Sequence, residues 1–211
     1  YESFTNADYD VIRDHCNNYE IDFCLSTFSV TSLEKTASTL PFIKIASADL
    51  TNIPFLESAS SLGKDIVLST GASSQSEIQT AIDILSSNGK VDIFLLHCVL
   101  SYPTPSAQAN LRRISSLRDS FPRCYVGYSD HTLGIEIPLA AVALGASVIE
   151  KHFTLDRTMK GGDHAASLEE PGLTKLIRDI KVMEQALGSP YKRKLKNEQA
   201  CFLKLAKSIV S

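Results

Sequence analysis

Two histidines stand at corresponding places near the ends of two successive apolar segments. His131 follows the segment YVGYSD, and His152 follows VIEK one strand–helix–strand unit later. If these segments are neighbouring parallel strands, about 4.8 Å apart, both imidazoles can reach one metal ion. Two imidazoles with open positions for water and substrate oxygens suit Mn, Co, Fe or Zn. The alternative is two ordinary histidines, one capping the Ser129–Asp130 turn and one packed near Phe153.

A lysine also lies inside an otherwise apolar segment. Lys44 in FIKI is costly to bury unless an anion accompanies it. The partner is either the carboxylate of Glu150, in the equally apolar VIEK, or a bound anion such as phosphate, and the sequence leaves both open. Hydroxyl side chains follow other segments and could complete a cradle for a small anion: Ser47, Ser69, Thr70 and Ser129.

Two loops carry further polar groups. The prolines of YPTP stiffen the loop that holds Tyr102, and we expect this ring to lie over the same rim. The segment KGGDH carries Asp163, which could orient a sugar hydroxyl, although loop aspartates more often cap a turn. We predict structural roles for the remaining histidines, His15, His97 and His164.

The elements that must position these residues follow a repeating order of apolar segment, polar turn and helix. Segments rich in β-branched residues, bounded by turns and separated by helices, predict parallel strands that are buried on both faces. The six predicted strands are 23–27, 42–45, 66–69, 93–97, 125–128 and 148–151. Ser74 and Glu77 have capping-box spacing before a helix, an apolar stripe predicts another helix that ends before Gly188, and a helix is expected over 7–19.

Alternating strands and helices favour an α/β fold, either a doubly wound sheet or a (β/α)8 TIM barrel. Polar clusters follow nearly every strand, which is how barrel enzymes build their sites, so we predict the barrel. No GxGxxG or GxxxxGK[ST] motif follows a strand, which lowers the case for nucleotide binding. Six strand–helix units are two short of a barrel, and we therefore expect residues 1–211 to be an incomplete TIM-barrel catalytic domain that lacks the first two units.

Composition excludes some partners. A net charge of −3 among 211 residues provides no basic field for nucleic acid or an anionic membrane. The longest nearly apolar segment, 137–149, is too short to span a bilayer. Five cysteines without CxxC spacing are typical of reduced, buried thiols, and we expect a cytoplasmic protein.

Several motifs, taken in order along the chain, resemble those of the sialic acid synthase family, which comprises the N-acetylneuraminate synthases and their legionaminate and pseudaminate relatives. The similarity covers nearly the whole chain at the family's spacing. The motifs are KIASADLTN, GKDIVLSTG, LLHCVLSYPTP, ANL, GYSDHTLGIEIPLAAVALGA, IEKHFTLDR and GGDH.

The resemblance implies a reaction and a set of residue roles. Phosphoenolpyruvate would condense with an N-acylated amino sugar such as N-acetylmannosamine, giving a nine-carbon 2-keto acid and phosphate. His131 and His152 match the ligands of Mn²⁺, with Mg²⁺ or Co²⁺ as alternatives, and Asp49 matches an acidic position near the reacting centre. The positions that match phosphoenolpyruvate-binding residues are Thr27, Lys44, Ser47, Ser69 and Ser129, and those that match residues around the sugar are Tyr102 and Asp163.

The sequence departs from the family pattern in places. Leu100 occupies a position where the family commonly has Asn. The family's glutamate after the first strand and lysine on the second have no counterpart, and neither does its small C-terminal antifreeze-like domain. A molecule that began at Tyr1 would be expected to be inactive. Two alternatives therefore stand beside the synthase: a non-catalytic remnant that keeps metal and anion binding, and another condensing barrel such as an octulosonate synthase. The resemblance also implies a homodimer.

Overall fold

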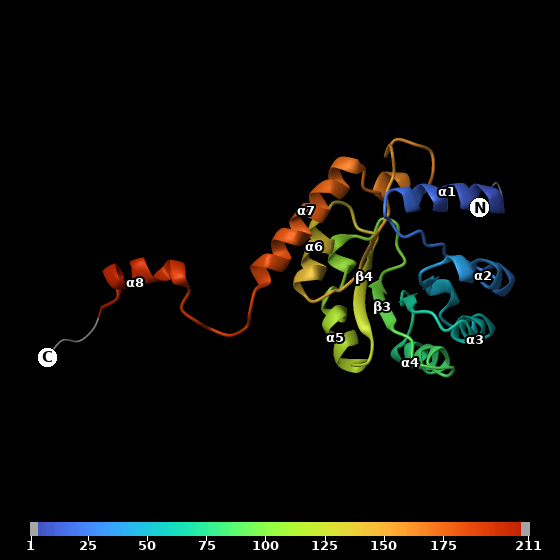
Figure 1. Cartoon of the computed structure of the whole chain (residues 1–211), viewed down its shortest axis with the longest axis horizontal. Helices are drawn as coiled ribbons and strands as arrows, with labels where there is room; N and C mark the ends of the chain where they lie inside the picture. The colour runs from blue at the N-terminus through green and yellow to red at the C-terminus, as the bar shows by residue number, and fades with distance from the viewer. Residues whose placement is uncertain (1–3, 208–211) are drawn as a thin grey trace.

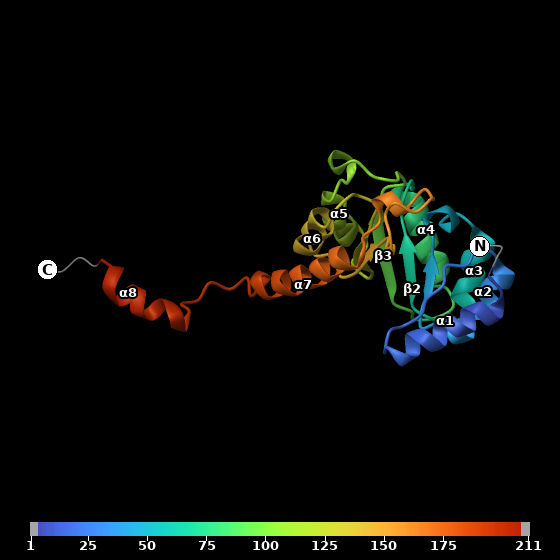
Figure 2. The same cartoon turned by 90° about the horizontal axis from the view of Figure 1, so that it is seen from above.

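The computed structural model describes residues 4–207, and its centre is a single parallel sheet. Five strands pair in chain order, each with its neighbour in sequence. Figure 1 shows β3 beside β4 at the centre, with helices around them, and Figure 2 shows β2 beside β3. The strands are β1 (Ile43–Ile45), β2 (Ile66–Ser69), β3 (Ile93–Cys98), β4 (Tyr125–Asp130) and β5 (Ile149–Lys151). This order confirms the prediction of an α/β fold built from consecutive strand–helix units.

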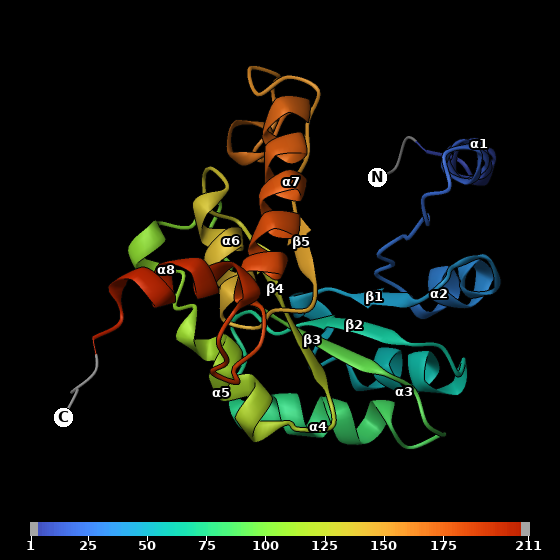
Figure 3. The same ribbon diagram turned by 60° about the vertical axis from the view of Figure 1, so that its left-hand side comes forward.

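The helices that connect the strands lie on the outer side of the curved sheet. Figure 3 shows α2 to α7 along this side, with α1 standing apart from them. After α7 the chain runs away from the sheet to α8 in both Figure 1 and Figure 2. The bounds are α1 (Asn6–Asn18), α2 (Val30–Thr36), α3 (Ile53–Ser61), α4 (Gln75–Leu85), α5 (Arg112–Ser120), α6 (Glu136–Ala143), α7 (Glu170–Leu187) and α8 (Gln199–Leu205).

Period-2 alternation gives the strands two different faces. One face packs under the helices and forms the apolar core, for example through Ile45, Leu68 and Leu95, all fully buried. The opposite, inner face carries the alternate residues, among them Lys44 of β1 and Ser129 of β4. The inner positions are also well shielded, with Ser129 only 2% exposed. The strands are therefore largely buried on both faces, as their composition predicted.

The sheet is curled into a half-barrel, and a contact across its inner face shows the degree of curling. In a flat sheet, four strand spacings would separate β1 from β5 by about 19 Å. The Nζ atom of Lys44 on β1 instead lies 3.5 Å from Oε2 of Glu150 on β5. The two outer strands therefore bend toward each other, and their inner side chains meet.

The sequence signals for helix ends are confirmed. Ser74 caps α4, its hydroxyl accepts a hydrogen bond from the backbone N–H of Glu77, and the Glu77 carboxylate accepts one from the backbone N–H of Ser74. Helix α7 ends at Leu187 and is followed by Gly188, whose φ of +53° is a conformation that glycine adopts without strain. The helix expected over 7–19 is α1, displaced by one residue.

The expectation of a strand at 23–27 is wrong. In this segment only Ser26 forms a bridge, with Lys44, and no ladder continues from it. The neighbouring strand, β1, has three residues, so little backbone is available for a longer ladder. The thiols are free as predicted, but the expectation that they are buried holds only for Cys98. Cys16, Cys24 and Cys124 are partly exposed, and Cys201 is exposed because α8 lies away from the sheet. Among residues 4–207, no helix has the length and apolar character needed to cross a membrane.

Candidate functional site

The two histidines singled out by their spacing lie side by side. Asp130 and Lys151, the last residues of β4 and β5, are paired in the register of the two strands. The residues that follow them, His131 and His152, therefore emerge at the same end of the sheet. Their ring centroids are 5.3 Å apart and their planes are nearly perpendicular, at 80°. The chain thus brings together two imidazoles at neighbouring strand ends.

The ring of His131 is held in one tautomer by the loop that follows β3. Its Nδ1 lies 2.8 Å from the carbonyl oxygen of Val99. Because a carbonyl only accepts hydrogen bonds, Nδ1 carries the hydrogen, and a neutral ring keeps its lone pair on Nε2. Burial lowers the pKa of His131, and the neighbouring His152 also lowers it, which favours this neutral form. The backbone N–H of Thr104 donates to the carbonyl of His131 at 2.8 Å, so loop and strand end are joined twice.

Tyr102 and Asp163 approach the histidines from two loops. The ring of Tyr102 lies 4.1 Å from the ring of His131 and 5.9 Å from that of His152, between centroids. An oxygen of Asp163 lies 3.8 Å from Nδ1 of His152, and the Asp163 side chain is largely exposed. The predicted placement of Tyr102 over the rim is confirmed, and Asp163 reaches the same place.

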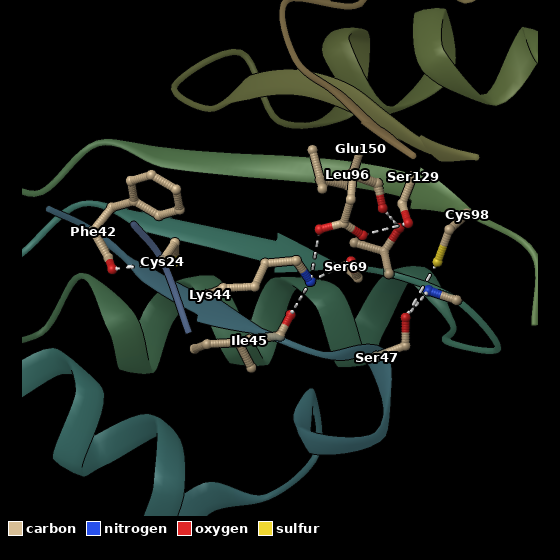
Figure 4. Close-up of polar contacts among 12 residues, drawn as sticks. Cys24, Phe42, Lys44, Ile45, Ser47, Ser69, Leu96, Cys98, Ser129 and Glu150 are labelled. Atoms are coloured by element: carbon tan, nitrogen blue, oxygen red, sulfur yellow. Dashed lines mark hydrogen bonds and ion pairs between the residues drawn. The ribbon is translucent and has the colours of Figure 1, made fainter. Parts of the chain in front are cut away.

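Lys44 occupies the inner face of the half-barrel among polar side chains. Its ammonium donates to Oγ of Ser69 at 2.9 Å and to the carbonyl of Ile45 at 3.2 Å, and it forms the ion pair with Glu150. The hydroxyl of Ser129 donates to the other oxygen of Glu150 at 2.6 Å. Figure 4 shows these side chains pointing toward one another. The internal Lys–Glu pair considered from the sequence is therefore present.

The ion pair of Lys44 is loose by the standards of charge-assisted hydrogen bonds. Its N–O distance of 3.5 Å exceeds the 2.7 to 2.9 Å usual for such pairs. The Glu150 side chain is 40% exposed, whereas that of Lys44 is 11% exposed. A largely buried ammonium with one distant, half-exposed carboxylate retains the capacity to bind a second anion.

Ser47 lies beside the lysine cluster, at the end of β1. Its hydroxyl accepts a hydrogen bond from the backbone N–H of Gly71 at 2.9 Å and lies 3.2 Å from Sγ of Cys98. Figure 4 shows this group next to the Lys44 network. Burial raises the pKa of the Cys98 thiol, so the sulfur is protonated and acts as a weak polar neighbour.

Thr27 and Asp49 are both buried. Thr27 is only 5% exposed, and among the described residues its Oγ1 has no hydrogen-bond partner. An orphaned buried hydroxyl is costly, so this atom is suited to a ligand. The carboxylate of Asp49 accepts a hydrogen bond from Asn52 at 2.9 Å, which ties it to the start of α3. A role for Asp49 at the reacting centre stays a prediction.

His97 and His164 make contacts that fit the predicted structural roles. Nε2 of His97 lies 2.8 Å from the carbonyl of Ala109, and burial lowers the pKa of its ring. Nδ1 of His164 lies 2.7 Å from the hydroxyl of Thr154, within the loop that carries Asp163.

Sequence reasoning missed one buried pair. Asp130 and Lys151 form an ion pair at 2.7 Å with side chains 0% and 5% exposed. Lys151, like Lys44, is a lysine in an apolar strand, and the same argument about buried charge applies to it. Its partner is recognisable only once the β4–β5 register is known.

A divalent cation at the two histidines would have few protein ligands. Within residues 4–207, no group of three or more His, Cys, Asp or Glu side chains is arranged to hold a metal ion. The two neighbouring imidazoles, one with a fixed tautomer, still fit a cation whose other positions are filled by water and substrate oxygens. Two protein ligands leave open positions, which suits catalysis rather than a structural metal.

Comparison with known proteins agrees with this description. The model of the NeuB family matches residues 2–192. N,N'-diacetyllegionaminic acid synthase of Campylobacter jejuni is 44% identical over 93% of this chain and 60% of its own length. N-acetylneuraminate-9-phosphate synthase of Mus musculus is 39% identical over 99% of this chain and 58% of its own. The crystal structure of the sialic acid synthetase of Leptospira borgpetersenii is 38% identical with a TM-score of 0.88, covering 95% of this chain and 70% of that one.

The curled parallel sheet, with its polar residues gathered at one end, defines an α/β domain of the TIM-barrel type. Together with the family match, this leads to the particular assignment: the chain belongs to the NeuB family. It spans about half to three fifths of the length of the curated relatives it matches first, at 51%, 60% and 58%.

Proposed function

We propose that this domain condenses phosphoenolpyruvate with an N-acylated amino sugar to form a nine-carbon 2-keto sugar acid and phosphate. The enol carbon of phosphoenolpyruvate joins the aldehyde carbon of the open-chain sugar, water adds at C2, and the C–O bond to phosphate breaks. Two features of the same sheet together support this proposal. The Lys44 ammonium is largely buried with only a loose ion pair, and the imidazoles of His131 and His152 lie side by side at one end of the sheet.

The polar inner face supplies the binding site for phosphoenolpyruvate in this proposal. Lys44 binds the phosphate or the carboxylate, with hydroxyls on β2, on β4 and on the segments before and after β1 completing the site. Preorganised charges and hydroxyls of this kind need no reorganisation during the reaction. The hydroxyls are those of Thr27, Ser47, Ser69 and Ser129.

His131 and His152 are the proposed ligands of a divalent cation, Mn²⁺ first and Mg²⁺ or Co²⁺ as alternatives. Such a cation, when bound, polarises the aldehyde of the acceptor sugar. The backbone carbonyl of Val99 keeps His131 in the tautomer that presents Nε2. Asp163 lies next to Nδ1 of His152, where it favours the corresponding tautomer of that ring.

The acceptor side of the site is assigned to the two loops. Tyr102 lies half-exposed against His131, and Asp163 is exposed beside His152. In the proposal these two side chains orient the sugar, and Asp49 acts near the reacting centre. We further propose that the protein acts in the cytoplasm as a homodimer. Its free cysteines are compatible with a reducing compartment, and the dimer rests on the resemblance alone.

The proposal is tested by metal binding and turnover together. His131→Ala and His152→Ala are each expected to abolish Mn²⁺ binding in calorimetry and phosphate release from phosphoenolpyruvate plus N-acetylmannosamine. His15→Ala, on the exposed surface of α1, is the matched control and should leave both measurements unchanged. Full activity in either active-site variant would contradict the ligand assignment.

The second candidate, a non-catalytic remnant, is distinguished by the same assay. The remnant binds Mn²⁺ and phosphate but releases no phosphate with any N-acylated amino sugar, whereas the synthase shows release that requires both substrates. Release with a phosphorylated pentose in place of the amino sugar would instead favour an octulosonate-type synthase.

A further inference from the structure

Asp130 and Lys151 form a buried ion pair on the face of the sheet opposite the substrate side. Each residue directly precedes one of the two candidate metal ligands, so alternation along the strands turns its side chain toward the core while the neighbouring histidine lies at the rim. The ammonium and the carboxylate are 2.7 Å apart, with side chains 5% and 0% exposed.

The same pair also fixes the backbone directly after His131. Oδ1 of Asp130 accepts a hydrogen bond from the backbone N–H of Thr132 at 2.9 Å. Nζ of Lys151 donates to the backbone carbonyl of Thr132. Both backbone polar groups of Thr132 are therefore bound to the pair, and Asp130 itself directly precedes His131. Lys151 is the last residue of β5 and directly precedes His152, so the pair links the two strand ends.

The surroundings of the pair keep its charges matched. Burial, with a further contribution from the Asp130 carboxylate, raises the pKa of the neighbouring Tyr128, so this phenol stays neutral. A single charge left in such a place is strongly destabilising, which makes the pair act as a unit. Replacing both charges by neutral groups of similar size is often tolerated, so the chain offers a way to remove the link without unfolding the domain.

We propose that Asp130 and Lys151 are positioning residues that set the relative placement of the His131 and His152 imidazoles. The metal-binding consequence rests on the proposed function, because it takes the two histidines as ligands of one cation. The placement of the two rings does not rest on the proposed function, because the rings and the ion pair are present in the chain without any metal. Partners behind a metal ligand typically change metal affinity roughly 10- to 100-fold when they are removed.

The test uses the whole chain with Asp130→Asn and Lys151→Met combined, which removes both charges while nearly keeping side-chain size. Two quantities are measured: Mn²⁺ affinity by electron paramagnetic resonance of the free ion, and the imidazole proton–nitrogen NMR resonances of the metal-free protein. The neighbouring rings make these resonances sensitive to the arrangement of His131 and His152. We expect Mn²⁺ binding to weaken roughly 10- to 100-fold. We also expect the imidazole resonances of both His131 and His152 to shift.

Leu85→Ala is the matched control, because it destabilises the core on α4 far from the histidines along the chain. It should change neither quantity. Wild-type Mn²⁺ affinity and wild-type resonances in the double variant would overturn the proposal. If this double variant does not fold, Asp130→Asn combined with Lys151→Gln, which also leaves no unpaired charge, is judged by the same two measurements. If the wild-type protein binds no Mn²⁺, the metal part of the proposed function fails, and the resonances alone decide whether the pair positions the rings.

Discussion

At the scale of single residues, the ammonium of Lys44 is the group with the clearest unmet capacity. Lys44→Met keeps the aliphatic stem and removes the charge. A charge-assisted hydrogen bond contributes about 1.5 to 3 kcal/mol, so we expect inorganic phosphate and phosphoenolpyruvate to bind roughly tenfold or more weakly, measured by calorimetry. Mn²⁺ affinity should be unchanged, because Lys44 contacts Ser69, Ile45 and Glu150 rather than either histidine.

Lys64 offers a matched control for this substitution. Its ammonium is bound to the backbone carbonyl of Leu40 at 2.6 Å, away from the inner face. Lys64→Met should therefore leave phosphate affinity at the wild-type value. Equal losses in the two variants would assign the effect to net charge rather than to the Lys44 site.

The burial of His97 leads to a prediction of how the free energy of unfolding depends on pH. Burial lowers the pKa of its ring in the folded protein below the value near 6.5 expected in the unfolded chain. The unfolded chain thus binds more protons below about pH 6.5, and the free energy of unfolding falls as the pH drops through this range. His97→Gln keeps a donor for the Ala109 carbonyl but does not titrate. Its thermal midpoint should fall less than that of the wild type between pH 7.5 and 5.5.

A variant that is destabilised elsewhere separates this effect from a general loss of stability. Leu117→Ala removes a buried side chain from α5 and leaves His97 in place. It should melt at a lower temperature at every pH and keep the wild-type slope. A His97→Gln slope equal to that of the wild type would show that this ring does not carry the pH dependence.

Contacts between residues could be predicted where the sequence shows which segments lie side by side. They could not be predicted where the contact depends on the register or the curl of the sheet. The pairing of His131 with His152 was predictable, because both follow strands that were recognisable from their composition. Lys44 was recognised as a buried charge, but the choice between an internal partner and an anion required the curl of the sheet. The link between Asp130 and Lys151 needed a register that composition does not encode.

At the scale of elements, Gly127 shows why β4 can pass so close to its neighbours. A Cβ atom at this position would lie 2.5 Å from Cδ2 of Leu96 and 2.6 Å from the backbone oxygen of Val148. Gly127→Ala therefore overpacks the inner face, which typically costs about 1 to 3 kcal/mol. Chemical denaturation should show a lower free energy of unfolding.

Gly162 is the matched control, because a Cβ atom there meets nothing within 4 Å. Gly162→Ala should leave the free energy of unfolding nearly unchanged. The idea of close packing at β4 would be wrong if both substitutions had the same small effect.

Elements were predicted best where local signals agree. The capping residues of α4 and the glycine that ends α7 are short-range features, and both ends were identified from sequence. Strand β4 proved longer than predicted, because it continues through the polar residues Ser129 and Asp130. Composition alone ends a strand at the first polar residue, whereas pairing continues wherever a neighbour supplies hydrogen bonds. The reverse error occurred at 23–27, where apolar residues have a single bridging partner.

At the scale of the whole molecule, the curl of the sheet assembles the candidate site. The strand order could be predicted from the alternation of segments, because each strand pairs with its neighbour in the chain. The barrel prediction implies a curled sheet, and Glu150 was one of the two partners considered for Lys44. The degree of curling could not be predicted, since curling accumulates over every pairing and no single motif specifies it. The proposed homodimer likewise has no local signature, and sedimentation equilibrium of the whole chain is the measurement that would establish it.

The contact between Lys44 and Glu150 has a consequence for the order of events when the chain folds. Each neighbouring pair of strands joins nearby parts of the sequence and can form early, because closing short loops costs little entropy. The Lys44–Glu150 contact instead needs all four strand pairings at once. We therefore expect that, after dilution from denaturant, far-ultraviolet circular dichroism recovers first and the capacity to bind phosphate returns last.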